Sequence, residues 1–458
     1  MELGDLPYEC LLCIFDCFSN LKLLLNLSTV CKQWNILVKQ RLKKIRHLHV
    51  ESKSDLSYVP FSSDNHIYTD DIGYLERVNV SQLLPNLKFF TKKPYLGSRC
   101  TCKMMVNVLS TSKPLVGLIC KAQCLVAGRM LGFYCHVNVD EMVKHCGNLE
   151  YLDTLFQPFL HSYFLKYKFG QNLKYFEGSI ESYNEDPENK DYETLLEETN
   201  LLCCYLKQMS NLEVLSLREP LIEPRLWPLP KMKLEEIRFK DITTETPVFQ
   251  FLPLLPDLRS IDLGIRYVNH DNEAFRDSYT HLNVQDVALD IQVFGRSSIR
   301  CLKLIRSILI KFPNHKRLFI RLTYQFSITN EDLVQIIKNS PNLTLFVLDV
   351  MSWGDANTIE TIDKFCKSTG RRISFYLLRD DRTWNYSVRT GSYTRYVLGE
   401  DCANPGTTDN KFLQNNGTFW RNEESTKFDI YMLSKISNLI LQRLPIIFIR
   451  MNPFSAEC

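Results

Sequence analysis

The sequence predicts an α/β chain: a three-helix N-terminal unit, then an irregular solenoid with parallel strands on its concave face and helices outside. Three observations predict this fold. Apolar residues in the first 46 positions recur at helical spacing. Between residues 45 and 380 a short strand-like template, apolar-x-x-apolar-x-apolar, returns many times. A helix-like segment and a turn dipeptide precede many of these templates, and helix, turn and strand in repetition are typical of a solenoid.

The first expected helix has one apolar face. Its residues fall at i, i+3, i+4 and i+7, namely Leu11, Ile14, Phe15 and Phe18. Pro7 suits the first turn of this helix, because the N–H groups there have no intrahelical acceptor. The sequence therefore predicts that a helix begins close to Pro7.

A second apolar series follows, and it predicts two more short helices. Its members are Leu24, Leu27, Val30, Cys31 and Trp34. Ser28 and Thr29 interrupt the series, where a hydroxyl is expected to cap a new helix. Three helices over about 40 residues bury little surface, since units of this size rarely fold alone. The surplus apolar residues should pack on something else, which is either the rest of the chain or a partner.

The residue order of this stretch closely resembles the F-box. The matching pieces are Leu6-Pro7, Ile14-Phe15 and Val30-Cys31-Lys32-x-Trp34, over roughly residues 3–47. The resemblance implies a three-helix hook that docks on the SKP-family adaptor and, through it, on a cullin of a ubiquitin ligase. Carried over residue by residue, the implied adaptor contacts are Leu6, Pro7, Leu11, Ile14, Phe15, Leu24, Val30, Cys31 and Trp34. Two positions depart from the family pattern. Cys10 stands where a larger aliphatic residue is commoner, and Phe18 stands where Leu is commoner; both remain apolar.

The composition is that of an ordinary globular protein. The 458 residues are 45% hydrophobic and 23% charged, with a net charge of +3 that is too small to indicate nucleic acid or a membrane surface. The start lacks the pattern of a signal peptide, and no apolar run is long enough for a membrane span. Most of the sixteen cysteines sit inside apolar runs, which favours a reducing compartment, the cytoplasm or the nucleus.

The strand-like template carries the prediction of a repeat domain. It begins at Ile45, Leu115, Leu212, Leu234, Leu258, Ile299, Leu343 and Ile373, with shorter forms at Leu87, Leu149 and Leu173 and an offset form at His315. Turn dipeptides introduce many of these, such as Gln171-Asn172 and Pro341-Asn342. The pattern resembles irregular leucine-rich repeats over roughly residues 45–380, without the polar residue that usually follows the strand. The alternative is an ordinary α/β domain with parallel strands that do not stack along one axis.

Alternate strand residues of a solenoid point to opposite faces, so the polar template positions should line the concave face. Early positions, such as Tyr151 and Asp153, are aromatic and mildly acidic; later positions are basic. Arginine pairs well with phosphate, so we expect the basic half to contact an acidic or phosphorylated target segment. The expected target-binding residues are Arg218, Arg238, Lys240, Lys303, Arg317, Arg321 and Arg379. The alternative is that these are solvated strand residues with no partner.

The repeat pattern stops at two places. Residues 181–200 are rich in acids and predict an exposed loop. From residue 381 onward the sequence predicts a hairpin around Gly391, an amphipathic helix near 428–444 and a final strand, which together would cap the repeat core. The expected domains are therefore residues 1–47 for the F-box, 48–380 for the repeats and 381–458 for the cap.

No catalytic or cofactor-binding pattern stands out. The spacing of Cys100, Cys102, Cys120 and Cys124 departs from paired C-x-x-C, and there is no phosphate-binding glycine loop or nucleophile elbow. We therefore expect no cofactor, no metal ligand and no enzymatic activity. The resemblance implies a substrate-recognition subunit of an SCF-type E3 ubiquitin ligase, which binds the adaptor through the F-box and a protein target through the repeats. The alternative function is a repeat scaffold that binds partners outside any ligase.

Overall fold

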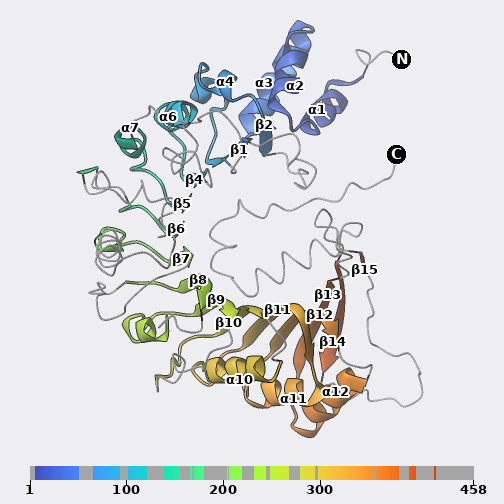
Figure 1. The fold of residues 1–458 in the computed structure, drawn as a ribbon. Coiled ribbons are helices and arrows are strands. Elements are labelled where there is room, and N and C mark those ends of the chain that lie inside the picture. Colours follow the sequence, from blue (N-terminus) through green and yellow to red (C-terminus); the bar gives the residue numbers. More distant parts are fainter. Residues whose placement is uncertain are drawn as a thin grey trace. The chain divides into compact units, whose positions relative to one another are not determined.

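The structure is a computed structural model (Figure 1). It describes residues 6–50, 65–92, 102–120, 139–154, 166–167, 170–179, 204, 206–218, 232–243, 248–267, 279–293, 298–353, 357–380, 391–398 and 417–418. The chain divides into two compact units. The first runs to Leu212 and takes in Met232; the second begins at Glu213 and resumes at Lys233.

Three helices open the first unit, and we call residues 6–46 the hook. The helices are α1 (Tyr8–Asp16), α2 (Leu21–Ser28) and α3 (Lys32–Lys44). Asn20 caps α2 by accepting a hydrogen bond from the backbone N–H of Leu23 at 2.9 Å. Cys31 occupies the N-cap position of α3.

The prediction that Ser28 or Thr29 caps α3 is wrong. Both hydroxyls instead donate backwards, to the carbonyls of Leu25 and Asn26 at 2.6 and 2.7 Å. A hydroxyl near a helix end has these two alternatives, since it can accept from the next helix or donate to the turn before it. Here the turn before it satisfies the side chain.

The first unit continues as a sheet of parallel strands in the order β2-β1-β3-β4-β5-β6. Its strands are β1 (His47–Val50), β2 (His66–Thr69), β3 (Phe89–Lys92), β4 (Gly117–Cys120), β5 (Tyr151–Thr154) and β6 (Tyr175–Ser179). The helices between them are α4 (Ile72–Leu75), α5 (Val80–Leu83), α6 (Cys102–Thr111) and α7 (Val139–Val143). Strand β2 lies outside β1, so the sheet has an edge strand next to the hook.

The second unit repeats the same plan. Its parallel strands follow one another in chain order: β7 (Val214–Arg218), β8 (Glu236–Thr243), β9 (Ser260–Tyr267), β10 (Asp286–Val293), β11 (Arg317–Ile328), β12 (Leu345–Trp353) and β13 (Ile373–Asp380). The 3-10 helix η7 (Val248–Leu254) and helices α10 (Ser298–Leu309), α11 (Asn330–Lys338) and α12 (Asn357–Ser368) connect them. The three α-helices lie on one side of strands β10 to β13 (Figure 1).

Each unit stacks its strands in register, which confirms the predicted α/β repeat solenoid. In the first unit, paired positions form one fully buried apolar row, comprising Leu48, Phe90, Leu118, Leu152 and Phe176. The second unit has an equivalent row, comprising Leu215, Ile237, Ile261, Val287, Leu318, Phe346 and Phe375. A strand buries such a row because its side chains alternate between the two faces of the sheet.

The template at Ile299 was wrongly expected to form a strand. Residues 298–309 form helix α10, whose buried residues Leu302, Ile305 and Leu309 recur at helical spacing. The apolar-x-x-apolar step fits both a helix and the template, and the longer i, i+3, i+7 series decides for the helix. The strand of that repeat is β11, close to the offset template at His315.

The turn dipeptides have a structural role. The side-chain amide of the turn asparagine donates to a backbone carbonyl of the preceding turn, from Asn172 to Gly147 at 2.9 Å and from Asn211 to Gln171 at 2.7 Å. The second unit has the same contacts, from Asn283 to Pro256, Asn314 to Leu282 and Asn342 to Pro313. This asparagine ladder precedes the strands, whereas the expected polar residue of the repeat family follows them.

The end of the repeats differs from the prediction at Gly391. This residue begins strand β14 (Gly391–Leu398), which pairs antiparallel with β13 in the register Asp380 to Gly391. A short strand β15 (Gly417–Thr418) pairs antiparallel with β14. A hairpin turn is therefore not centred on Gly391. The predicted loop at 181–200, the helix near 428–444 and the final strand lie outside the described residues.

Candidate functional site

The hook has an apolar interior made of residues from all three helices. Leu11 and Phe15 of α1 and Leu24 of α2 are at most 1% exposed. The ring of Phe15 meets the ring of Trp34 edge-to-face, with centroids 5.5 Å apart. Three of the nine implied adaptor contacts, Leu11, Phe15 and Leu24, are thus interior residues that hold the helices together.

Other implied contacts lie on the surface of the hook. Pro7, Val30 and Cys31 are exposed, and the exposed fraction of Val30 is 60%. Ile36 of α3 is 52% exposed and was missed by the sequence analysis. Leu6, Ile14 and Trp34 are half-buried. We call Pro7, Val30, Cys31 and Ile36 the exposed hook residues.

Ile36 was not predicted as a contact, because the F-box motif ends before this residue. Ile36 lies two residues beyond the last motif position, Trp34, and on the same helix. The helix already buries Leu37, Val38 and Leu42 in the hook, so Ile36 remains on its exposed side.

A buried arginine seats the hook on the first strands of the repeats. Arg41 of α3 is 1% exposed. Its guanidinium donates to the carbonyl of Phe18 at 3.4 Å and to the carbonyl of His66 at 3.1 Å. One side chain thus joins the end of α1, helix α3 and the edge strand β2. Buried charged groups need such partners, because an unpaired polar group in the interior is strongly unfavourable.

Backbone contacts extend this seat. The N–H of Tyr68 in β2 donates to the carbonyl of Ser19 at 2.8 Å, and the Asn86 side chain donates to the carbonyl of Lys43 at 2.7 Å. The carbonyl of Arg46 accepts from the N–H groups of Lys88 and Phe89. Only Ile45 and Arg46 separate α3 from β1. The hook is therefore hydrogen-bonded directly to strands β2 and β3 and continues into β1.

The strand face of the first unit, opposite its apolar row, is aromatic and buried. Tyr151 and Tyr175 stack with ring centroids 4.2 Å apart. The Tyr175 hydroxyl donates to the carboxylate of Glu177 at 2.6 Å, and Asp153 and Glu177 are also buried. These residues were expected on the concave face. Their packing against side chains of the neighbouring strands leaves them little exposed surface.

The strand face of the second unit carries ion pairs between neighbouring strands. Arg317 forms two hydrogen bonds with Asp286, and Arg321 contacts Asp349 at 2.6 Å. Asp290 lies 3.8 Å from Arg321 on its other side. Burial raises the pKa of Asp286 to about 6, although Arg317 opposes this shift. Acids therefore accompany the predicted basic residues in register.

The remaining predicted target residues divide as follows. Arg238 pairs with Glu236 at 2.6 Å, and Lys240 on the same strand is half-buried. Lys303 lies on the exposed side of α10, so its expected place on a strand was wrong for the reason given for the Ile299 template. Arg218 and Arg379 are in β7 and β13, and their side chains lie outside the described part of the chain.

Two of these acids, Asp286 and Asp290, were missed because their strand was not predicted. Strand β10 supplies Asp286 and Asp290, and the residues at its start, Val284-x-x-Val287-x-Leu289, do fit the repeat template. The match at Ile299 predicted a strand for that repeat in its place. Counting the spacing from Leu258 to Val284 would have identified β10 and, with it, the carboxylates beside the arginines.

The F-box-like family model matches residues 3–46. A comparison with curated proteins gives no match. Among the described residues, no helix is both long and apolar enough to cross a membrane. The matched segment coincides with the three-helix hook, and parallel strands of the repeats follow it without a linker. The chain therefore has an F-box-like domain at its N-terminus, followed by parallel-strand repeats that are consistent with leucine-rich repeats.

Proposed function

We propose that this F-box protein is the substrate-recognition subunit of an SCF-type E3 ubiquitin ligase. The hook binds a SKP-family adaptor, which connects the chain to a cullin, and the repeats bind the protein to be ubiquitinated. The F-box-like match over residues 3–46 carries this proposal. The exposed apolar residues Val30 and Ile36 support it, because a hook already seated on β1 to β3 does not need them for its own core.

The adaptor surface proposed here is smaller than the motif. Pro7, Val30, Cys31 and Ile36 make the contact, and the half-buried Leu6, Ile14 and Trp34 border it. Leu11, Phe15 and Leu24 support this surface from inside the hook. Apolar side chains that become fully desolvated at an interface dominate its binding energy.

The chain itself contributes binding and position rather than acid–base chemistry. A target held on the repeats stays close to a conjugating enzyme carried by the cullin, so an encounter between two molecules becomes effectively intramolecular. The short, directly hydrogen-bonded junction between α3 and β1 suits this role, since it limits how far the first strands of the repeats can move relative to the adaptor.

For the target we propose the strand face of the second unit, with Arg238, Lys240, Arg317 and Arg321 as contacts. Arg218 and Arg379, which belong to strands β7 and β13, remain predicted contacts of the same target. Because Glu236, Asp286 and Asp349 already pair with arginines, an acidic or phosphorylated target segment must compete with these carboxylates. Replacing Arg238, Lys240 and Arg321 together by alanine should weaken target capture, and unchanged capture would remove this surface from the proposal.

Co-purification from cells with a blocked proteasome tests the ligase assignment. The intact chain should recover adaptor, cullin and ubiquitinated target, and a chain without residues 1–44 should lose adaptor and cullin while it keeps the target. A full-length double variant, Val30→Asp with Ile36→Asp, should also lose adaptor and cullin while it keeps the target. If the intact chain recovers repeat-bound partners but neither adaptor nor cullin, the chain is a scaffold outside any ligase.

A further inference from the structure

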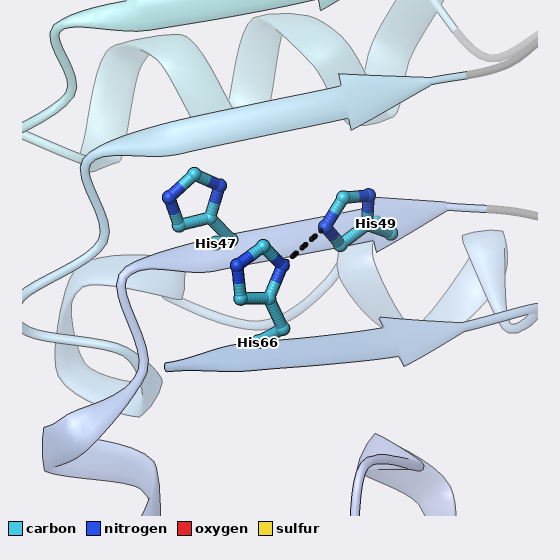
Figure 2. A group of neighbouring side chains, drawn as sticks. All are labelled: His47, His49 and His66. Atoms are coloured by element: carbon cyan, nitrogen blue, oxygen red, sulfur yellow. Dashed lines mark hydrogen bonds between the residues drawn. The ribbon is translucent and has the colours of Figure 1, made fainter. Parts of the chain in front are cut away.

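Three histidines gather at the start of the repeats, beside the seat of the hook. His47 and His49 alternate along β1, and His66 of β2 is the register partner of His47 (Figure 2). The ring of His47 stacks on the ring of His66, with centroids 4.2 Å apart and planes 13° from parallel. Figure 2 shows all three imidazoles on one face of the two strands, with a hydrogen bond between His49 and His66.

The nitrogen atoms of this cluster are close together. Nε2 of His49 lies 2.9 Å from Nδ1 of His66. One ring nitrogen from each of the three histidines can be chosen so that all lie within 4.8 Å of one another. Two ligands at positions i and i+2 of a strand, with a third on the neighbouring strand, present three donors to one point above the sheet.

His47 is the unexplained member of the cluster. Its side chain is 4% exposed, and its Nε2 atom is buried without a hydrogen-bond partner. Phe89 of β3 stacks on it at 4.8 Å and offers no polar group. A phenylalanine would serve equally well if stacking were the whole purpose of this position. A buried imidazole nitrogen without a partner points instead to a ligand.

The cluster lies in a largely buried environment. Burial, together with the neighbouring His66, His49 and Arg46, lowers the pKa of His47 to about 2. Burial and Arg41 lower the pKa of His66 to about 4.

We propose that His47, His49 and His66 bind a divalent transition-metal ion of the zinc class. Three imidazoles are an established zinc ligand set that leaves a fourth, open position for water or another donor. Zn–N distances of about 2.0–2.1 Å in a tetrahedral site place ligand nitrogens about 3.3 Å apart. To reach this spacing, the imidazole rings would have to turn about the Cβ–Cγ bond, a torsion with a broad, shallow preference.

The position of this site gives it a structural consequence. The carbonyl of His66 accepts the hydrogen bond from Arg41 that seats the hook. A metal ion shared by β1 and β2 would fasten the edge strand that carries this carbonyl. Metal binding should therefore stabilise the junction between the hook and the repeats, whether or not the chain works in a ligase.

Zinc and cobalt titrations of the purified full chain test the proposal. We expect one tightly bound Zn²⁺ per chain by elemental analysis after dialysis, and a higher thermal unfolding midpoint with Zn²⁺ than after treatment with a chelator. With Co²⁺ in its place, the visible spectrum should show tetrahedral nitrogen and oxygen ligation without thiolate charge transfer. This last reading separates the histidines from the sixteen cysteines.

The variants His49→Gln and His66→Gln should each weaken Zn²⁺ binding by at least about 10–100-fold, the loss that even supporting residues of metal sites cause. Both are half-buried positions, so circular dichroism should show that the variants still fold. His145→Gln, a half-buried histidine outside the cluster, is the matched control and should bind like the parent chain. Absence of stoichiometric zinc, a thiolate spectrum, or equal binding by the parent and His66→Gln would each overturn the proposal.

Discussion

The interior and the exposed surface of the hook use the same kinds of residue for different purposes. Phe15 and Leu24 are apolar and fully buried, whereas Val30 and Ile36 are equally apolar and more than half exposed. Both groups lie within 30 residues of one another. The comparison teaches that a binding motif mixes residues that build the helices with residues that meet a partner, and that only burial separates them.

The largest expected effect is on the interior side, at Phe15. Phe15→Ala removes a ring that contacts Phe18 and Trp34, and such substitutions cost about 3–5 kcal/mol of stability. We expect hydrogen exchange to show lost protection throughout α1 to α3, with adaptor binding lost as a consequence. Protection in the strands of the second unit is the internal control. A change in unfolding free energy below about 1 kcal/mol would place Phe15 outside the core.

The next largest effect is expected at the seat, at Arg41. Arg41→Met keeps the length of the side chain but leaves the carbonyls of Phe18 and His66 without their buried donor. An unsatisfied buried group costs about 1–3 kcal/mol. Chemical denaturation should show this loss, and hydrogen exchange should place it at the contact between α3 and β2. If the variant is as stable as the parent chain, the hydrogen bonds of Arg41 do not hold the hook on the strands.

The smallest effect is expected at Lys44, which belongs to the same helix as Arg41 and, like Arg41, approaches Asp16. Lys44 contacts Asp16 at 2.5 Å but is 44% exposed. Lys44→Met should change the unfolding free energy by only about 0–1 kcal/mol, as exposed ion pairs do. A loss as large as that of Arg41→Met would show that charge, rather than burial, decides the strength of the seat.

Much of the fold could be predicted from local patterns. The repeating template placed most of the strands, because a rung needs apolar residues at fixed positions to fill the shared core. The same pattern failed at Ile299, where three residues of helix α10, Ile299, Leu302 and Leu304, satisfy the whole template. The strand that starts just after Val284 was not predicted, although its residues fit the template. A short pattern defines a strand only when the spacing between successive repeats is counted as well.

The site was harder to predict than the fold, since it depends on which residues are buried. The motif named Leu11 and Val30 alike, although one is interior and the other 60% exposed. The histidine cluster needed a pairing between β1 and β2 that no template predicted. The His47-x-His49 spacing was visible in the sequence, but His66 comes next to it only through the parallel register.

The affinity of a purified SKP-family adaptor for the full chain tests the central claim most directly. The variant Val30→Asp with Ile36→Asp should fold normally and bind at least about 30-fold more weakly, the effect of losing about 2 kcal/mol of contact energy. Ile310→Asp, which changes an isoleucine that is 63% exposed near the end of α10, is the matched control and should bind like the parent chain. Equal binding by the parent chain and the double variant, or no binding by either, would contradict the account of the hook as an adaptor-binding surface.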